Sequence, residues 1–286
     1  MHGVTWRITA FSLILGLALT MLPDTTGADD GLILGVHPYL PPKELIKRFE
    51  PLAGYLGKAI GQTIEVRIGR NYDDHIEAAG KERIDIAFMG PVSYIKLVER
   101  HGMKPILARL ETNGLPTFRG TIVVRKDSPL NNLAELKGKR FAFGDPDSTM
   151  SHLVPEYMLL RAGVRRKDLA DHRFLGGHHN VVLAVLAGDF DAGAVKDEVF
   201  QQYEPKGLRA LADTPAFSDH VFVTRATLPA DTVQSLRAAL LRLKSLPEGA
   251  AIMQSIKKDM TALIPAADSD YDNLRTVVKA LESRRD

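Results

Sequence analysis

The chain has 286 residues, which is enough for two domains of ordinary size. Its 37 basic and 35 acidic residues nearly cancel, and a net charge of +2 argues against a nucleic-acid-binding surface. The absence of cysteine excludes disulfides and a lipid anchor on cysteine, while 45% hydrophobic residues can build a substantial core.

The N-terminal 28 residues have the pattern of a secretory signal peptide. Arg7 precedes an apolar run over residues 8–22, and Thr26 and Ala28 supply the small side chains that a signal peptidase requires. An uncleaved membrane anchor is the alternative, but the run is short for a membrane span. The sequence predicts cleavage after Ala28 and a soluble protein in a bacterial periplasm.

Short apolar segments then alternate with longer amphipathic ones. Strands are expected at 32–36, 64–68 and 84–89, and helices at about 42–60, from 72, and at about 92–100. Pro51 is expected to kink or divide the first helix. Alternation of this kind is typical of a parallel sheet flanked by helices.

A second series of the same kind begins after a loop at 113–116. Its expected strands are 121–125, 140–143, near 174 and 190–195, and its expected helices are 153–160 and 179–187. The last third returns to a strand at 221–223 and then becomes helical. The predicted fold class is therefore α/β with two lobes, each a mostly parallel sheet flanked by helices, and a ligand cleft between them.

Three hydroxyl residues, Ser148, Thr149 and Ser151, lie between the strand 140–143 and the helix that follows. Hydroxyl residues at this position commonly cap the helix, but one cap needs only one of them. Helix N-termini carry free amides and partial positive charge, so the cluster is predicted to bind an anion.

Further candidates follow other expected strands, at the sheet edge where ligands bind in α/β proteins. His178 is interpreted as an anion donor, as a core or surface histidine, or as a metal ligand; the adjacent His179 points elsewhere on a helix, which disfavours metal. Asp197 either caps a helix or accepts a hydrogen bond from an acidic P–OH group or an amine on the ligand. Tyr39 and Tyr94 are core aromatics or hydroxyl donors. No metal ion and no cofactor is predicted.

A hydrolase is the enzymatic alternative, because Ser148, His178 and Asp197 could form a catalytic triad. The chain has no GxSxG motif, and hydroxyls on both sides of Ser148 suit static binding better than nucleophilic attack.

Five stretches carry a family resemblance: GVHPY, FEPLAGYLGKAIG, IDIAFMGPVSY, LAELKGKRFAFGDPDST and GGHHNVVLAVLAGDFDAGAVKDEVF. Together they resemble the phosphate-, phosphite- and phosphonate-binding proteins of periplasmic ABC importers, of the type II periplasmic-binding family. The resemblance implies two lobes joined by two hinge strands: 29–119 plus 220–286, and 120–219. It also implies a set of residues around the oxyanion, namely Ser148, Thr149, Ser151, Tyr94, Tyr39, His178 and, on the far side, Asp197.

The chain departs from the family pattern at Met150, Gly177 and His179, where serine, serine and an acidic residue are usual. If the Met150 thioether faces the cleft, the pocket should prefer a P–H or P–CH₃ group to a P–OH group; otherwise Met150 packs in the core. The resemblance implies a monomeric protein, not an enzyme, that delivers a phosphonate, phosphite or phosphate to an ABC permease. Presentation of the ligand to a periplasmic sensor kinase is the alternative, and a hydrolase is the third.

Overall fold

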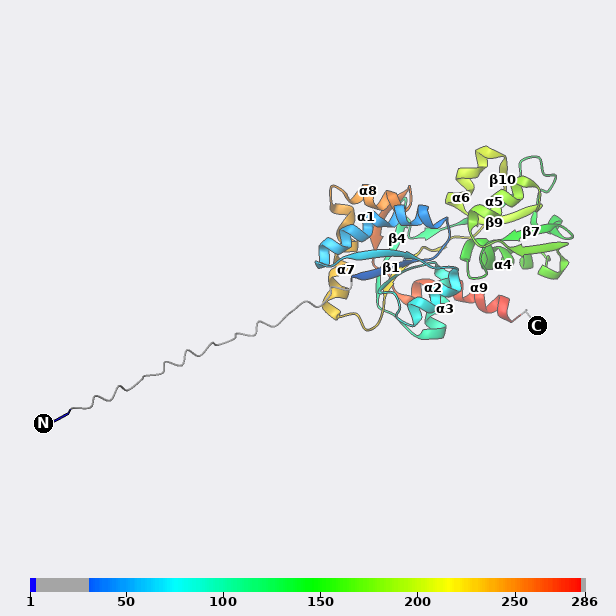
Figure 1. The fold of residues 1–286 in the computed structure, drawn as a ribbon. Coiled ribbons are helices and arrows are strands. Elements are labelled where there is room, and N and C mark those ends of the chain that lie inside the picture. Colours follow the sequence, from blue (N-terminus) through cyan, green and yellow to red (C-terminus); the bar gives the residue numbers. More distant parts are fainter. Residues whose placement is uncertain (4–30, 284–286) are drawn as a thin grey trace.

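Two separate β-sheets organise the computed structural model, which describes residues 1–3 and 31–283 (Figure 1). Apart from its first three residues, the predicted signal peptide with its cleavage site after Ala28 lies outside the described residues. Within the described part, no helix combines the length and the apolar composition that crossing a bilayer requires.

The first sheet has the strand order β13-β4-β12-β3-β1-β2 and forms the centre of what we call lobe 1. Strands β2, β1 and β3 in one half of the sheet are parallel, whereas β12, β4 and β13 join by antiparallel pairing. The strands are β1 Leu32–Val36, β2 Ile64–Ile68, β3 Ile86–Met89, β4 Ile106–Thr112, β12 Val221–Thr224 and β13 Met260–Ile264.

The second sheet has the order β10-β6-β9-β7-β8 and forms the centre of lobe 2. Strands β9, β7 and β8 are parallel, and β6 and β10 pair antiparallel. The strands are β6 Gly120–Arg125, β7 Arg140–Phe143, β8 Asp171–Phe174, β9 Ala192–Lys196 and β10 Leu208–Asp213. The two-lobed α/β class is confirmed, but both sheets are mixed rather than mostly parallel. The lobe boundaries at 119/120 and 219/220 stay predictions.

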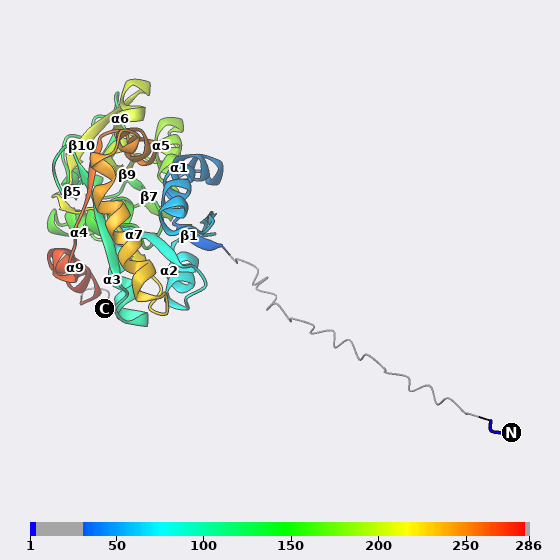
Figure 2. The same ribbon diagram turned by 90° about the vertical axis from the view of Figure 1, so that its left-hand side faces the viewer.

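Helices cover both sheets (Figures 1 and 2). A π-helical turn at Thr149–Leu153 runs directly into α4. The α-helices are α1 Pro42–Ile60, α2 Tyr72–Gly80, α3 Pro91–His101, α4 Val154–Arg161, α5 His178–Ala187, α6 Asp197–Tyr203, α7 Ala230–Arg242, α8 Gly249–Ile256 and α9 Asp272–Glu282. Short 3₁₀ turns occur at Leu133–Leu136, Arg166–Asp168, Glu204–Lys206, Leu243–Ser245 and Asp268–Tyr271.

The expected break at Pro51 does not occur, because α1 continues through it to Ile60. A proline inside a helix removes one amide hydrogen bond and crowds the preceding turn. Pro51 lies on the exposed side, while Phe49, Leu52 and Leu56 are fully buried in the core of lobe 1. Burial of this apolar face outweighs the lost hydrogen bond and keeps the helix whole.

Two short strands lie where the chain passes between the lobes. Strand β5, Thr117–Phe118, pairs antiparallel with β11, Phe217–Ser218, so that Phe118 stands opposite Phe217. This two-stranded sheet, which we call the hinge, precedes β6 and β12. The last helix, α9, packs against α3 of lobe 1 and also against α4 of lobe 2.

Candidate functional site

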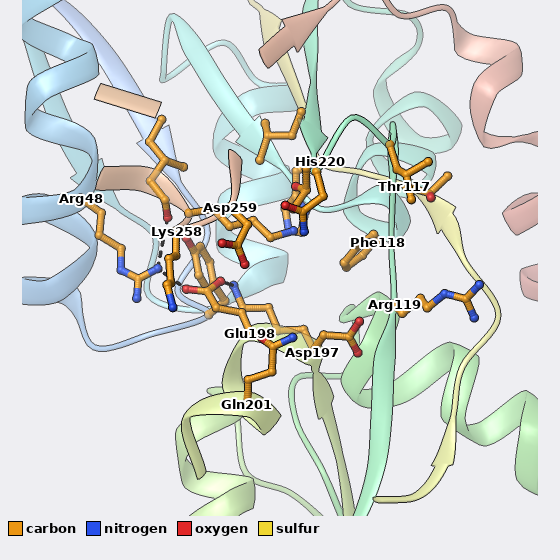
Figure 3. Close-up of a pocket in the computed structure, with 18 of the residues that line it drawn as sticks. Arg48, Thr117, Phe118, Arg119, Asp197, Glu198, Gln201, His220, Lys258 and Asp259 are labelled. Atoms are coloured by element: carbon orange, nitrogen blue, oxygen red, sulfur yellow. Dashed lines mark hydrogen bonds and ion pairs between the residues drawn. The ribbon is translucent and has the colours of Figure 1, made fainter. Parts of the chain in front are cut away.

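Two connected cavities lie between the lobes, and they share Tyr39, Phe118, Lys196 and His220 in their walls. The larger, of about 500 Å³, is the cleft shown in Figure 3. The smaller, of about 10 Å³, has room for about one water molecule. Its remaining walls are His37, Tyr72, Gly90, Ser148, Thr149, Met150 and His178. We call this smaller cavity the anion pocket.

The hydroxyl cluster reaches the anion pocket on the π-helical turn after β7. Ser148 caps this turn, since its Oγ accepts a hydrogen bond from the Ser151 amide at 3.3 Å. The amides of Thr149 and Met150 lie in the first turn, where the helix itself supplies no carbonyl partner. Ser148 therefore serves as a cap and still has its hydroxyl proton to donate to a ligand.

Thr149 connects the pocket to lobe 1. Its Oγ1 accepts a hydrogen bond from the Val92 amide, at the start of α3, over 3.0 Å. Because a hydroxyl group has one proton and two lone pairs, the Thr149 proton remains available to a ligand. Ser148 and Thr149 are 2% and 5% exposed, so a bond to either one forms out of bulk water.

Ser151 is buried but does not line the anion pocket. Its Oγ faces Gly144 so closely that a Cβ at Gly144 would lie 1.9 Å from it. Within residues 31–283 this Oγ has no hydrogen-bond partner. The structure thus separates Ser151 from Ser148 and Thr149.

Met150 lines the pocket and also belongs to the hydrophobic core. Its sulfur lies 3.4 Å from the hydroxyl oxygen of Thr214, and its side chain packs in the cluster that contains Phe118 and Phe217. Met150 is thus a core residue at the wall of the pocket, and the prediction that its thioether faces the ligand stays a prediction.

His178 is held as a neutral donor at the start of α5. Its Nδ1 accepts a hydrogen bond from the Lys196 amide at 3.2 Å, so its proton is on Nε2. Burial lowers the pKa of His178 well below the usual value, and the charge of Lys196 adds to this effect. The ring lines the anion pocket and can donate one hydrogen bond without carrying charge.

Lys196 brings a buried positive charge to the wall shared by the two cavities. Its Nζ lies 3.8 Å from the centroid of the Tyr39 ring and 2.9 Å from Oε2 of Glu198. Burial lowers the pKa of Lys196, whereas Glu198 raises it. Tyr39 therefore faces the site as an aromatic surface under a cation, and burial raises its own pKa.

Asp197 lines the large cleft rather than the anion pocket. Its Oδ1 accepts a hydrogen bond from Thr121 at 3.3 Å, and burial raises its pKa. With His178 Nδ1 occupied by an amide and Asp197 bonded to Thr121, the hydrogen bonds of a Ser148–His178–Asp197 triad are not made.

Tyr94 lies outside both cavities. Its hydroxyl donates to Oδ1 of Asp268 at 2.8 Å, and its ring packs against Tyr271 with the centroids 4.8 Å apart. Other residues of α3 contact lobe 2: the Val92 amide bonds to Thr149, and Lys96 pairs with Asp147.

Sequence reasoning missed further side chains of the pocket, namely His37, Tyr72, Phe118, Lys196 and His220. His37 follows β1 and His220 precedes β12, so each stands at the end of a central strand of lobe 1. The signal for His37 was present in GVHPY, directly before the predicted Tyr39. His220 gave no local signal, because it follows the hinge rather than a strand end in a βα unit.

Several contacts close the lobes over the pocket. Arg48 on α1 pairs with Glu198 on α6, and Lys96 on α3 pairs with Asp147. The amide of Tyr72 also donates to Asp145 at 3.4 Å. These contacts hold the two lobes together around the anion pocket, which stays partly open.

The residues that the structure describes contain no group of three His, Asp or Glu side chains arranged to hold a metal ion. His178 turns its Nδ1 to the Lys196 amide, and its neighbour His179 lines neither cavity.

The model of one protein family matches residues 34–271; its description is ABC transporter, phosphonate, periplasmic substrate-binding protein. The phosphate-import protein PhnD of Mycolicibacterium smegmatis is 25% identical, over 92% of this chain and 90% of its own length. The phosphonates-binding periplasmic protein of Escherichia coli is 23% identical, over 86% of this chain and 76% of its own length.

Solved structures agree on the fold. A Prochlorococcus marinus protein in complex with methylphosphonate superposes with a TM-score of 0.81 at 24% identity, over 89% of this chain and 99% of that one. A binding-protein component of an ABC phosphonate transporter from Pseudomonas aeruginosa superposes with a TM-score of 0.78 at 20% identity, over 86% of this chain and 84% of that one.

Proposed function

The chain belongs to the periplasmic substrate-binding proteins of ABC phosphonate transporters, and we propose that its own ligand is a small phosphorus oxyanion bound by the residues of the anion pocket. Because the pocket has room for about one water molecule here, it must widen to admit the ligand. The ligand would be a phosphonate, phosphite or phosphate, passed on to a membrane permease. We expect the protein to act as a monomer and to leave its ligand chemically unchanged.

The observation that carries this proposal is the convergence of donors from lobe 2 on one small cavity between the lobes. Ser148 and Thr149 offer hydroxyl protons, His178 offers Nε2–H, and Lys196 adds a cation nearby. Buried donors of this kind bind oxygens with negative charge, and hydrogen bonds to charged groups are stronger than neutral ones.

The relatives support the class of ligand. One is described as importing phosphate, another as binding phosphonates, and a structural neighbour holds methylphosphonate. The unformed triad supports binding without catalysis.

Calorimetry with methylphosphonate, phosphite, phosphate, aminoethylphosphonate and sulfate tests the proposal. At least one phosphorus oxyanion should bind, and Thr149→Ala should weaken it. Ser255→Ala, a hydroxyl deletion on α8 outside both cavities, is the matched control and should bind normally. If none of these phosphorus compounds binds, the proposed ligand class is wrong. Incubation with a phosphonate ester should release no alcohol.

A further inference from the structure

Two histidines of lobe 1 present the same ring atom to the anion pocket. A Cβ placed on Gly90 would lie 3.7 Å from Nε2 of His37 and 3.8 Å from Nε2 of His220. The two rings stack, with centroids 5.4 Å apart and an interplanar angle of 13°. Both Nε2 atoms therefore point to one spot beside Gly90, where α3 begins.

The other nitrogen of each ring fixes its tautomer. His37 Nδ1 lies 3.1 Å from the carbonyl oxygen of Phe88, and His220 Nδ1 lies 2.8 Å from Oδ1 of Asp219. Because both partners can only accept, each Nδ1 carries a proton. A neutral ring then has a lone pair at Nε2, and within residues 31–283 neither Nε2 has a partner.

The surroundings keep both rings neutral. Burial lowers the pKa of His37 well below its usual value, and the nearby His220 and His75 lower it further. Burial also lowers the pKa of His220, although Asp219 opposes this. Besides Tyr39, the titratable groups around the pair are Tyr72 and His75 on α2, His178 on α5, Lys196 on β9, and Asp219 with Lys257 at 3.3 Å.

A pair of acceptors is unsuited to an anion that has lost every proton, because lone pairs would face lone pairs. We propose that the Nε2 lone pairs of His37 and His220 share the hydroxyl proton of a phosphorus oxyanion in a three-centre hydrogen bond. The bound species therefore keeps a P–OH group, and for a phosphonate or phosphite it is the monoanion. The donors of lobe 2 then bind its other oxygens. This inference rests on the proposed function and assigns to the histidines the acceptor role that the sequence suggested for Asp197.

The proposal has a direct consequence for selectivity. Methanesulfonate has nearly the shape of methylphosphonate, but it has no acidic proton at neutral pH. Sites that hydrogen-bond a ligand hydroxyl reject analogues without it, because their buried polar groups lose a partner. Methanesulfonate should therefore bind about a hundredfold more weakly than methylphosphonate, or less well still.

Calorimetry of the mature protein with both compounds, below and above the second pKa of methylphosphonate, tests the proposal. Above that pKa the monoanion fraction falls, so the Kd for methylphosphonate should rise about tenfold per pH unit. In that range about one proton should be taken up per ligand bound, which buffers of different ionisation enthalpy reveal.

Variants locate the acceptor. His37→Phe and His220→Phe keep a ring in the stack but remove Nε2, and each should weaken methylphosphonate binding about tenfold to a hundredfold. His75→Phe is the matched control, because His75 Nε2 also lies 3.1 Å from the Phe88 carbonyl, yet His75 does not line the anion pocket. It should bind normally.

Any of three results would overturn the proposal. They are equal affinity for methanesulfonate and methylphosphonate, a Kd for methylphosphonate that does not change with pH, and unchanged binding of methylphosphonate by both phenylalanine variants. The sulfonate comparison needs no variant, so it decides even if a substitution prevents folding. Failure of methylphosphonate, phosphite and phosphate to bind at any pH would instead refute the proposed function.

Discussion

Arg48 of lobe 1 and Glu198 of lobe 2 form an ion pair at the mouth of the large cleft. Burial alone would raise the pKa of Glu198, but Lys196 and Arg48 lower it to about 2. Glu198 thus has two roles. It joins the lobes through Arg48, and it holds Lys196 beside the anion pocket.

Arg48→Met should weaken closure and leave Glu198 paired with Lys196. A partly buried pair of this kind is worth about 1 kcal/mol, so ligand affinity should fall about fivefold, mainly through faster release. Stopped-flow measurement of ligand dissociation checks this. The control is Glu44→Gln, which removes the other carboxylate bonded to Arg48, within lobe 1. An unchanged release rate in Arg48→Met would show that the pair does not hold the lobes together.

Ser148→Ala and Thr149→Ala should each weaken binding of the oxyanion about tenfold to a hundredfold, because each removes one hydrogen bond to a charged group. Ser151→Ala should bind as the unmodified chain does, since Ser151 faces Gly144. Calorimetry on the three variants separates them. Equal losses in all three would restore Ser151 to the site.

Tyr94→Phe should leave ligand affinity unchanged and lower the free energy of unfolding by about 1–2 kcal/mol, since it removes the bond to Asp268. Chemical denaturation and calorimetry on one preparation measure both. A weaker ligand complex with unchanged stability would place the hydroxyl in the site after all.

Met150→Ser addresses the choice between ligands. Where an apolar wall faces a P–OH group, that group loses water without gaining a partner, at a cost of about 1–3 kcal/mol. We therefore expect the chain to prefer phosphite or a small alkylphosphonate to phosphate by about tenfold, and we expect serine to narrow this preference. Competition titrations measure the ratio. If Met150→Ser lowers stability but leaves the ratio of the phosphite and phosphate affinities unchanged, Met150 acts only as a core residue.

Glu156 should contribute to acid sensitivity. Burial raises its pKa, but His152 and Arg166 together lower it to about 2. Its folded pKa is thus below the unfolded value of about 4.5, so its contribution is present above pH 4.5 and is lost as the pH falls toward 2. Glu156→Gln should cost on the order of 2 kcal/mol at neutral pH and flatten this acid limb. Urea unfolding as a function of pH measures both. If the free energy of unfolding falls with pH in the same way for the unmodified chain and Glu156→Gln, Glu156 does not contribute to the acid sensitivity.

The sequence predicted those site residues that lie next to one another in the chain. Ser148 and Thr149 stand where a strand turns into a helix, and this order of residues is readable from the chain alone. The α/β alternation likewise predicted both lobes. The antiparallel strands were not predicted, because strand direction depends on how β12 and β13 return to the sheet, and an apolar run carries no direction.

Side-chain direction and long-range pairing could not be read from the sequence. Whether the Tyr94 side chain faces the cleft or, as found, Asp268 depends on the rotation of α3, since neighbouring helical residues point about 100° apart. The stacking of His37 on His220 joins the ends of two strands that are distant in the chain. It becomes visible only once the sheet order is known.

Phe118 belongs both to the hinge and to the wall of the two cavities, where it meets His220 edge-on with the centroids 5.0 Å apart. Figure 3 shows the segment from Thr117 to Arg119 on one side of the cleft and Arg48 with Glu198 on the other. In a rigid-body rotation, atoms near the axis move least and atoms far from it move most. If the lobes rotate about the hinge, we expect Arg48 and Glu198 to move apart farther than the walls beside Phe118. The side of the cleft at Arg48 would then open to water first, while the donors of lobe 2 still hold the ligand.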